Sequence, residues 1–298
     1  MKNNKNRKTK LPLVVGIVIA VIVAIIMVVK NNPQNDSNIK TQNTANEVTV
    51  HFVDVGQGDC EIIQTQNCNV IIDAGENTAK DAVLSYVKKL GITKFDYVIA
   101  THPHSDHIGS LDDVIKNYDI GTIIMPQVKD DLVPTTSAYK NLLNSISKKE
   151  LKIHKAIPDE TFDLDGATLT VLGPLSDYDD LNSYSVVCKL TYKNKSFLFS
   201  GDAQKDAELD IIEKYQDALK ADVYKVGHHG SKSSSCNEYL SKIKPEYAVI
   251  SCGVGNDYGH PHKTLMDRLK NINVLRTDEH GSIVFTTDGN ELSYKTQK

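Results

Sequence analysis

The chain has 298 residues, which is room for one large domain or two small ones. Its five cysteines are odd in number and show no CxxC spacing, so buried thiols are expected rather than a disulfide framework. Seven of the 34 Lys and Arg residues and one of the 38 Asp and Glu residues precede Glu47. The chain from Glu47 onward therefore has 27 basic and 37 acidic residues, a net charge of about −10. Such an acidic charge is not typical of proteins that bind nucleic acid without sequence preference.

The N-terminal residues differ from the rest in composition. Residues 11–29 carry no charge and, at ~1.5 Å per helical residue, are long enough to cross a bilayer. Because basic residues precede this run, the positive-inside rule predicts a cytoplasmic tail over 1–10, a transmembrane signal-anchor over 11–30 and an extracellular location for the following chain. A cleaved signal peptide is the alternative, but its apolar region is normally shorter and no small-x-small site follows Val29.

The segment after the apolar run is polar. Residues 31–46 show no hydrophobic periodicity, which predicts a disordered linker. The remainder, residues 47–298, is large for one domain but within the range of a layered α/β sandwich. We therefore expect a single domain over 47–298.

The first half of this domain alternates predicted strands with predicted helices. Alternating apolar residues predict a strand over 48–55, followed by a turn at 56–58. Further strands are predicted at 60–64, 70–72, 95–101 and 121–125, and an edge strand at 151–155. Helical spacing predicts helices at 79–90, ending at Gly91, and at 110–116 and 135–149.

Four metal-binding side chains lie within six residues directly after the predicted strand 95–101. They are His102, His104, Asp106 and His107. Imidazole and carboxylate together suit zinc and similar divalent ions. His102 and His104 can bind one ion, while Asp106 and His107 bind a second ion beside it. A histidine-rich surface loop is the alternative, but further His and Asp clusters recur at strand ends downstream.

The second half repeats the alternation of strands and helices. Strands are predicted at 168–172, 186–192, 196–200, 223–226, 247–251 and 283–287, and helices near 203–215, 236–243 and 263–269. Two β-sheets covered by helices accommodate both halves. A disulfide between Cys60 and Cys68 across a hairpin stays open as an alternative to buried thiols.

The HxHxDH pattern after a strand resembles the signature of the metallo-β-lactamase fold superfamily. Together with this loop, residues 52–59, 72–75, 199–202, 225–231 and 258–262 resemble, in order, the extracellular hydrolase domain of ComEC-type DNA-uptake proteins and their stand-alone relatives. The resemblance extends from about Val48 to the C-terminus. It implies a mixed α/β fold, the αββα four-layer sandwich, with two bound divalent ions, zinc or manganese.

The resemblance also implies roles for residues outside the metal loop. Asp202 is implied as the carboxylate that bridges the two ions, with an N-cap of the following helix as the alternative. His228 is implied as the final ligand of the second ion, and an extended chain there would direct His229 elsewhere, toward substrate. Asp73 is implied to orient a metal-binding histidine by accepting a ring N–H.

The superfamily pattern is incomplete in one respect. Many members have a histidine between HxHxDH and the bridging aspartate as third ligand of the first ion. Here that interval contains only His154, in a Lys-rich stretch, and the expected position holds Asn182. This departure resembles the ComEC branch. The third ligand of the first ion would then be water, Asn182 or the substrate.

Other polar residues at strand ends are predicted to orient metal ligands or contact substrate, with structural turns as the alternative. These residues are Asp54, Gln57, Asp59, Asp73, Asn182, Ser231 and His262. His260 and His262 flank Pro261, which suits the first turn of a helix. His260 is predicted to protonate a leaving group, with metal binding as the competing role. Lys225, Lys232 and Lys263 are predicted to form a basic rim for phosphates, with a solvated surface as the alternative.

These predictions combine into a membrane-anchored extracellular metal-dependent hydrolase, a phosphodiesterase or nuclease of ComEC-like type. A metal-bound hydroxide would attack phosphorus, and the catalytic residues would be Asp106, His229 and His260. The expected partners are a phosphodiester substrate, DNA or a surface phosphodiester, and the membrane, with no obligate protein partner. The alternatives are a phosphorylcholine-esterase-like or other small-ester hydrolase, then a β-lactam hydrolase, and, from another class, a non-catalytic surface binding module.

Overall fold

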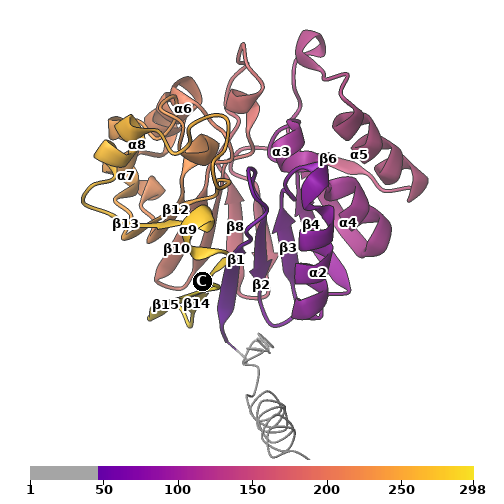
Figure 1. Cartoon of the computed structure of the whole chain (residues 1–298), viewed down its shortest axis with the longest axis horizontal. Coiled ribbons are helices and arrows are strands. Elements are labelled where there is room, and N and C mark those ends of the chain that lie inside the picture. The colour runs from indigo at the N-terminus through magenta and orange to yellow at the C-terminus, as the bar shows by residue number, and fades with distance from the viewer. Residues whose placement is uncertain (1–45) are drawn as a thin grey trace, which may run out of the picture. The chain divides into compact units, whose positions relative to one another are not determined.

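The computed structural model describes residues 46–298, which belong to one compact unit (Figure 1). The predicted cytoplasmic tail and signal-anchor, and the predicted linker up to residue 45, lie outside the described residues. Within residues 46–298, no helix has both the length and the apolar character needed to span a membrane.

Two β-sheets form the centre of the fold, as the sequence predicted. The first contains, in spatial order, β15 (Leu292–Thr296), β14 (Ile283–Thr287), β1 (Val48–Phe52), β2 (Glu61–Gln64), β3 (Asn69–Ile72), β4 (Lys94–Ile99), β5 (Asp119–Met125) and β6 (Ile153–Lys155). The second contains β13 (Asn273–Arg276), β12 (Tyr247–Ile250), β11 (Val223–Lys225), β10 (Lys195–Phe199), β9 (Cys188–Tyr192), β8 (Ala167–Val171) and β7 (Thr161–Leu164).

Helices cover the outer face of each sheet (Figure 1). Against the first sheet lie α2 (Lys80–Leu90), α3 (Ser105–Ile108), α4 (Leu111–Asn117) and α5 (Ser137–Lys148). Against the second lie α6 (Lys205–Tyr215), α7 (Asn237–Ile243) and α8 (Lys263–Arg268). A short α9 (Thr277–His280) and the 3-10 turns η1 (Asn77–Ala79), η2 (Asp130–Leu132), η3 (Asn182–Tyr184), η4 (Gln216–Leu219) and η5 (Gly227–Gly230) complete the elements.

The alternation of side chains along each strand explains the layering. On β1, Val50 and Phe52 enter the core between the sheets, whereas His51 points outward and its Nδ1 lies 3.0 Å from the Tyr86 hydroxyl on α2. On β10, Phe197 and Phe199 enter the same central core, whereas Leu198 packs under the helices of the second sheet. β10 thus contributes to two cores, and burial of both its faces helps to hold the sheets and helices together.

The structure departs from the predicted elements at several points. It adds β7, β13 and β15, and it begins α5 at Ser137 because the Thr136 side chain accepts a hydrogen bond from the Tyr139 N–H at 3.3 Å, the arrangement of an N-cap. The helix α8 begins at Lys263, so Pro261 precedes the helix and does not occupy its first turn.

The cysteines form no disulfide. All five are free and buried, as expected for buried thiols. Cys60 packs in the core beneath α2 and α4, whereas Cys68 packs in the core between the sheets. The two thiols therefore lie on opposite faces of the first sheet, which excludes the alternative of a Cys60–Cys68 bridge.

The topology gathers the predicted functional residues at one end of the sandwich. The strands β3, β4 and β5 are parallel neighbours in the first sheet, and β10, β11 and β12 are parallel neighbours in the second. Their carboxyl ends meet at the same edge, and the loops that follow β3, β4, β10 and β11 carry Asp73, the HxHxDH segment, Asp202 and the His228–His229 pair.

Candidate metal centre

The HxHxDH segment connects β4 to α3 at this edge. His102 is fully buried, and its Nδ1 lies 3.2 Å from the Thr101 hydroxyl and 3.3 Å from the Ser185 hydroxyl. His104 is the N-cap residue of α3, and its Nδ1 lies 3.0 Å from His102 Nε2. Hydrogen bonding at Nδ1 therefore turns the Nε2 atom of His102 toward His104 and the interior of the site.

Asp73 fixes the next histidine of the segment. Its carboxylate accepts hydrogen bonds from the Thr101 N–H at 2.8 Å and the Thr101 hydroxyl at 2.6 Å. The second of its oxygens also lies 2.7 Å from His107 Nδ1. Both Asp73 and His107 are fully buried, so this pair holds the ring with Nε2 directed at Asp202, 3.2 Å from its Oδ1. This is the orienting contact that the sequence predicted for Asp73.

The tandem histidines follow β11 in an unusual backbone conformation. His228 and His229 both have positive φ, 52°, within η5. His229 was expected to point away from the metals if the chain is extended here, but the chain is not extended, because two successive left-handed residues turn the backbone sharply. As a result, His229 is directed into the site: Nδ1 lies 3.1 Å from the Ser251 carbonyl oxygen, and Nε2 lies 3.2 Å from His107 Nε2.

Asp59 enters the site from the loop between β1 and β2. Gly58 permits this approach because its φ is +143° and a Cβ there would lie 2.3 Å from the Asp106 carbonyl oxygen. The Asp59 N–H donates to that same carbonyl at 3.2 Å. One Asp59 oxygen pairs with the buried Lys225 ammonium at 2.6 Å, and the other lies 3.1 Å from His229 Nδ1. Both side chains of the Lys225–Asp59 pair are 1% exposed.

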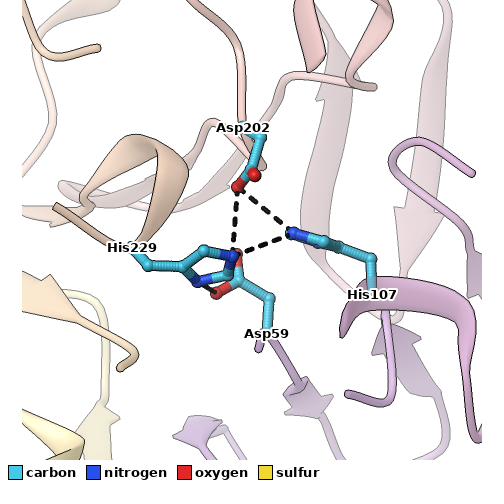
Figure 2. Close-up of side chains that lie close together, drawn as sticks. All are labelled: Asp59, His107, Asp202 and His229. Carbon is cyan, nitrogen blue, oxygen red and sulfur yellow. Dashed lines mark hydrogen bonds and ion pairs between the residues drawn. The ribbon is translucent and has the colours of Figure 1, made fainter. Parts of the chain in front are cut away.

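Four buried residues form the centre of the cluster (Figure 2). Asp59, His107, Asp202 and His229 each offer one ligand atom, and these atoms all lie within 4.8 Å of one another. Asp106 borders this group, with its Oδ2 3.1 Å from His229 Nε2. Asp59 was predicted to orient metal ligands or contact substrate, and His229 to be a catalytic residue near the substrate. The structure brings both into the group that has metal-ligand spacing.

The cluster fits a divalent metal ion. His107 and His229 are both hydrogen-bonded at Nδ1, so in the neutral form of both rings the Nε2 lone pairs would face each other across only 3.2 Å. Two buried carboxylate oxygens, Asp59 Oδ1 and Asp202 Oδ1, lie 3.1 and 3.2 Å from nitrogens of these histidines but have no hydrogen bond of good geometry. Opposed lone pairs and unpaired carboxylate oxygens are costly when buried, and a cation between them satisfies all of these atoms.

The pKa values of the clustered histidines and of Asp202 also indicate that the site favours positive charge. Burial disfavours a charged ring, but Asp202 and Asp59 outweigh it and raise the pKa of His229 to about 10. Asp202 and Asp73 likewise hold the pKa of His107 well above its ordinary value despite burial. Burial opposes ionisation of Asp202 as well, yet the charges of His229 and His107 hold its pKa well below the usual range. The carboxylates thus attract protons onto two histidines at the place where a cation fits.

The other oxygen of Asp202 faces a second group of histidines. Asp202 Oδ2 lies 3.8 Å from His102 Nε2 and 3.6 Å from His228 Nε2. Asp202 Oδ1, in contrast, lies 3.2 Å from His107 Nε2 and 3.6 Å from His229 Nε2. One carboxylate therefore presents a separate oxygen to each of two histidine pairs, the arrangement expected of a bridging ligand.

A cavity of about 480 Å³ opens onto the cluster. Its lining includes residues of the metal loop and of the predicted substrate set: Gln57, His104, Asp106, Asn182, Asp202, His228, His229, Tyr258 and His260. Tyr258 is 64% exposed, and its ring stacks on His260 with the ring centroids 5.6 Å apart and the planes at 20°. Burial, followed by the charges of His229 and His228, lowers the pKa of His260 to about 4.

Three predicted residues lie away from the cluster. Asp54 accepts from neither histidine pair; its N–H donates to the Ser282 hydroxyl at 3.0 Å and its carboxylate faces Lys298 at 3.5 Å. Ser231 contacts the Ser233 hydroxyl at 3.0 Å, and His262 Nδ1 accepts from the Lys232 N–H at 3.0 Å.

Sequence reasoning missed several residues that support the site. Thr101, Ser185 and Ser233 hydrogen-bond the histidine rings, and no sequence pattern distinguishes them from other polar residues. Lys225 was predicted to lie on a basic rim, and this is wrong because it is buried and paired with Asp59. Its position between Tyr224 and Val226, in an apolar strand, was the available signal.

Comparison with known proteins identifies a matching family and several similar proteins. The family model described as "Metallo-beta-lactamase superfamily" matches residues 53–254. The chain is 28% identical over 267 residues to ComE operon protein 3 of Bacillus subtilis, covering 81% of this chain and 33% of that protein. It is 27% identical over 245 residues to competence protein ComA of Neisseria gonorrhoeae, covering 80% of this chain and 32% of that protein. The chain thus spans about a third of the length of these ComEC-type relatives.

Among solved structures, the metallo-β-lactamase fold protein YhfI from Bacillus subtilis superposes with a TM-score of 0.51. The identity is 14%, and the match covers 81% of this chain and 100% of YhfI. A likeness at this identity concerns the fold alone.

Proposed function

The chain belongs to the metallo-β-lactamase superfamily and is a metal-dependent hydrolase related to competence proteins, and on that premise we propose that it is a phosphodiesterase that hydrolyses DNA outside the cell. The observation that carries the proposal is the position of Asp202, whose two oxygens face two histidine pairs at 3.2–3.8 Å. Paired sites of this kind suit in-line displacement at phosphorus.

The residues of the cluster have two roles, binding the metal ions and orienting the residues that bind them. His102 and His104 beside one oxygen of Asp202, and Asp106, His107 and His229 beside the other, would hold the two ions. When bound, divalent ions lower the pKa of water and neutralise the charge that develops on a phosphate. Asp73 and the Ser251 carbonyl fix the rings of His107 and His229, so these histidines need no reorganisation during the reaction.

The aromatic residues at the mouth of the cavity favour a substrate with a flat ring. Tyr258 is exposed at the rim and lies parallel to His260, which leaves its outer face open to a nucleobase. At neutral pH the ring of His260 is neutral, because its pKa is lowered to about 4, so it is suited to polar contact with substrate rather than to carrying a positive charge. One relative is named a competence protein, and that name favours DNA as the substrate.

A second candidate is a small phosphodiester on the cell surface, such as a choline phosphate. Residues 47–298 carry a net charge of about −10, and a polyanion is repelled by such a domain except where cations are concentrated. A small substrate contacts the metal ions alone and avoids this repulsion.

We further propose that residues 11–30 hold the protein in the cell membrane with the domain outside. Residues 11–29 carry no charge and follow a basic segment, as a signal-anchor does. Mass spectrometry of the membrane fraction is expected to find a chain that retains Leu11–Val29. A soluble form that begins near Asn31 would contradict the anchor and indicate a secreted protein.

The activity is tested on the purified full-length chain, stripped of metal with a chelator and reloaded with manganese or zinc. Reloading should restore hydrolysis of labelled single-stranded DNA and of bis(4-nitrophenyl) phosphate. Asp202→Asn should lower both rates by at least 100-fold, since it removes the oxygen charge shared by the two sides. His154→Ala is the control, because His154 lies on β6 and contacts Glu160. A metal-replete protein that hydrolyses neither substrate would contradict the proposal.

A further inference from the structure

In the described residues, the first metal ion lacks the third histidine ligand that many superfamily members have between the HxHxDH segment and the bridging aspartate. His154, the one histidine between the HxHxDH segment and Asp202, lies on β6, and its Nε2 contacts Glu160 at 2.7 Å. The segment before β9, where a histidine was expected, instead places Ser185 at the centre. Its hydroxyl lies 3.3 Å from His102 Nδ1 and accepts from the Asp202 N–H at 2.9 Å. This segment orients the site but supplies no imidazole.

The tandem histidines offer a replacement because their rings separate across Asp202. With both residues at φ 52°, His229 is buried and faces Oδ1 of Asp202, whereas His228 faces Oδ2. The ring planes of the two histidines are inclined at 76° with centroids 6.2 Å apart. An extended chain would also separate neighbouring side chains, but to opposite faces of a strand and not to two sides of one carboxylate.

The backbone that produces this geometry is firmly held. The His228 N–H donates to the Gly201 carbonyl at 3.0 Å, which ties the tandem histidines directly to the loop that carries Asp202. Gly230 follows with φ +87°, and a Cβ there would lie 2.6 Å from Pro261 Cβ. The His262 N–H then donates to the Gly230 carbonyl at 2.9 Å. These contacts fix the turn at both ends and so fix the side of Asp202 on which His228 lies.

The ring of His228 is also oriented. Its Nδ1 lies 3.3 Å from the Ser233 hydroxyl, and its Nε2 lies 3.6 Å from Asp202 Oδ2. His102 is arranged in the same way, with Nδ1 against hydroxyl groups and Nε2 3.8 Å from the same oxygen. A histidine that binds metal through one nitrogen characteristically hydrogen-bonds through the other.

We propose that His228 replaces the missing histidine as the third imidazole ligand of the first metal ion, beside His102 and His104, with Asp202 Oδ2 as the fourth protein ligand. Three imidazoles and one carboxylate form a donor set that suits zinc better than magnesium or calcium. The inference rests on the proposed metal-dependent function, but its test measures metal content and not turnover.

Asn182 is the competing ligand. It borders the same cavity, and its Oδ1 is buried without a hydrogen bond. An amide oxygen is a weaker zinc ligand than imidazole, and the side chain carries no positioning contact comparable to that between His228 and Ser233.

The test is the zinc content of the full-length chain after equilibration with zinc and removal of free ion, measured by plasma mass spectrometry. Wild type is expected to retain two equivalents, and His228→Ala about one. Asn182→Ala and the matched control His154→Ala should each retain two. With cobalt in place of zinc, His228→Ala should lose one part of the visible absorption spectrum and retain the part due to the other ion.

Each outcome bears on the inference separately from the proposed function. Two equivalents retained by His228→Ala, or one lost by Asn182→Ala, would overturn it, as would a wild type that holds only one. Circular dichroism checks that the variants are folded, and Ser233→Ala, which leaves the imidazole in place, should weaken the affinity for one of the two ions without removing it. A protein with two zinc ions that hydrolyses no phosphodiester would contradict the proposed function and leave the assignment of His228 standing.

Discussion

At the scale of single residues, the candidate site depends on a buried ion pair between Lys225 and Asp59, one of the carboxylates of the cluster. Lys225 rises from β11 between the two sheets, and its ammonium contacts Asp59 at 2.6 Å and the Val226 carbonyl at 3.1 Å. Asp59 in turn lies beside His229. The lysine charge compensates one carboxylate of the cluster and also joins the loop after β1 to the second sheet, so stability and site geometry share this contact.

Lys225→Met should therefore destabilise the protein more than an ordinary loss of an ion pair. Removing the ammonium leaves Asp59 buried without its cation, a change that typically costs about 3–5 kcal/mol. Urea unfolding of the purified protein measures the difference in the free energy of unfolding. Lys195→Met is the matched control, because the Lys195–Asp222 pair is wider, 3.6 Å, and partly exposed, so a loss below about 1 kcal/mol is expected. Equal losses in the two variants would show that the buried pair has no special weight.

Tyr258 provides a residue-scale test of the substrate. Stacking of a base on an aromatic ring is worth about 1–3 kcal/mol, or about 5- to 150-fold in affinity. Tyr258→Ala should weaken binding of single-stranded DNA to the metal-loaded protein by a factor in this range, measured by fluorescence anisotropy, while Tyr258→Phe should preserve it. The rate of hydrolysis of a small phosphodiester should change less than threefold. An unchanged DNA affinity in Tyr258→Ala would remove the ring as a base platform.

At the scale of elements, the position of α7 depends on a side chain of α6. Glu208 is fully buried and accepts hydrogen bonds from the backbone N–H groups of Ser235 and Cys236, the latter at 2.9 Å. These groups precede α7, where N–H groups lack helical partners. Ser235 also follows the turn that contains His228 and Ser233, so Glu208 connects α6 to the end of the segment that carries the tandem histidines.

Glu208 should make stability depend on pH. Burial raises its pKa from 4.5 to about 7 despite the two backbone hydrogen bonds. The folded protein therefore binds this proton more tightly than the unfolded chain. The resulting stabilisation is fully present below pH 4.5 and is lost as the pH rises through 7, by about 3 kcal/mol at ~1.4 kcal/mol per pKa unit.

Urea unfolding of wild type and Glu208→Gln between pH 4.5 and 8 tests this expectation. The glutamine cannot ionise, so the difference in the free energy of unfolding between the two proteins should change in favour of Glu208→Gln as the pH rises. Glu208→Ala should be destabilised at every pH, because both backbone N–H groups lose their acceptor. A difference that is constant over this range would contradict the raised pKa.

Most elements could be predicted because their side chains follow simple periods. The edge strand expected at 151–155 is β6 at the edge of the first sheet, and the strand expected at 283–287 is β14 with the same bounds. The strand β13 was missed because Asn273 and Arg276 at its ends interrupt the apolar pattern, and β7 because its charged Asp163 separates only two apolar residues. Both strands lie at sheet edges, where pairing on one side supplies part of the order that the sequence lacks.

The site could be predicted in composition more readily than in geometry. The spacing of HxHxDH already places its four side chains together, since a short loop constrains them. The direction of His228 and His229 could not be inferred, because it depends on two left-handed residues that the turn and its contacts with Gly201 and Pro261 impose. The approach of Asp59 depends likewise on a contact between loops far apart in sequence.

At the scale of the whole molecule, charge decides between the two substrates proposed. Residues 47–298 carry about −10, and Lys225 is withdrawn from the surface. Lys263 is 87% exposed and pairs with Asp267 at 2.9 Å, which reduces its value as a phosphate contact. DNA must therefore bind through few cations close to the cavity, whereas a small phosphodiester needs none of them.

The dependence on salt separates these cases. If DNA is the substrate, its affinity for the metal-loaded full-length protein should fall as salt rises, with a logarithmic slope of about 0.7 for each contacted phosphate of a single strand. Replacing Lys232 and Lys263 together by Glu should weaken DNA binding and lower this slope by one or two contacts, while hydrolysis of bis(4-nitrophenyl) phosphate should be little affected by either salt or substitution. The two lysines are the appropriate pair because both are exposed and flank the turn of the tandem histidines and the start of α8. A flat salt dependence with equal effects on both substrates would instead favour a small surface phosphodiester, since such a substrate releases almost no counterions on binding.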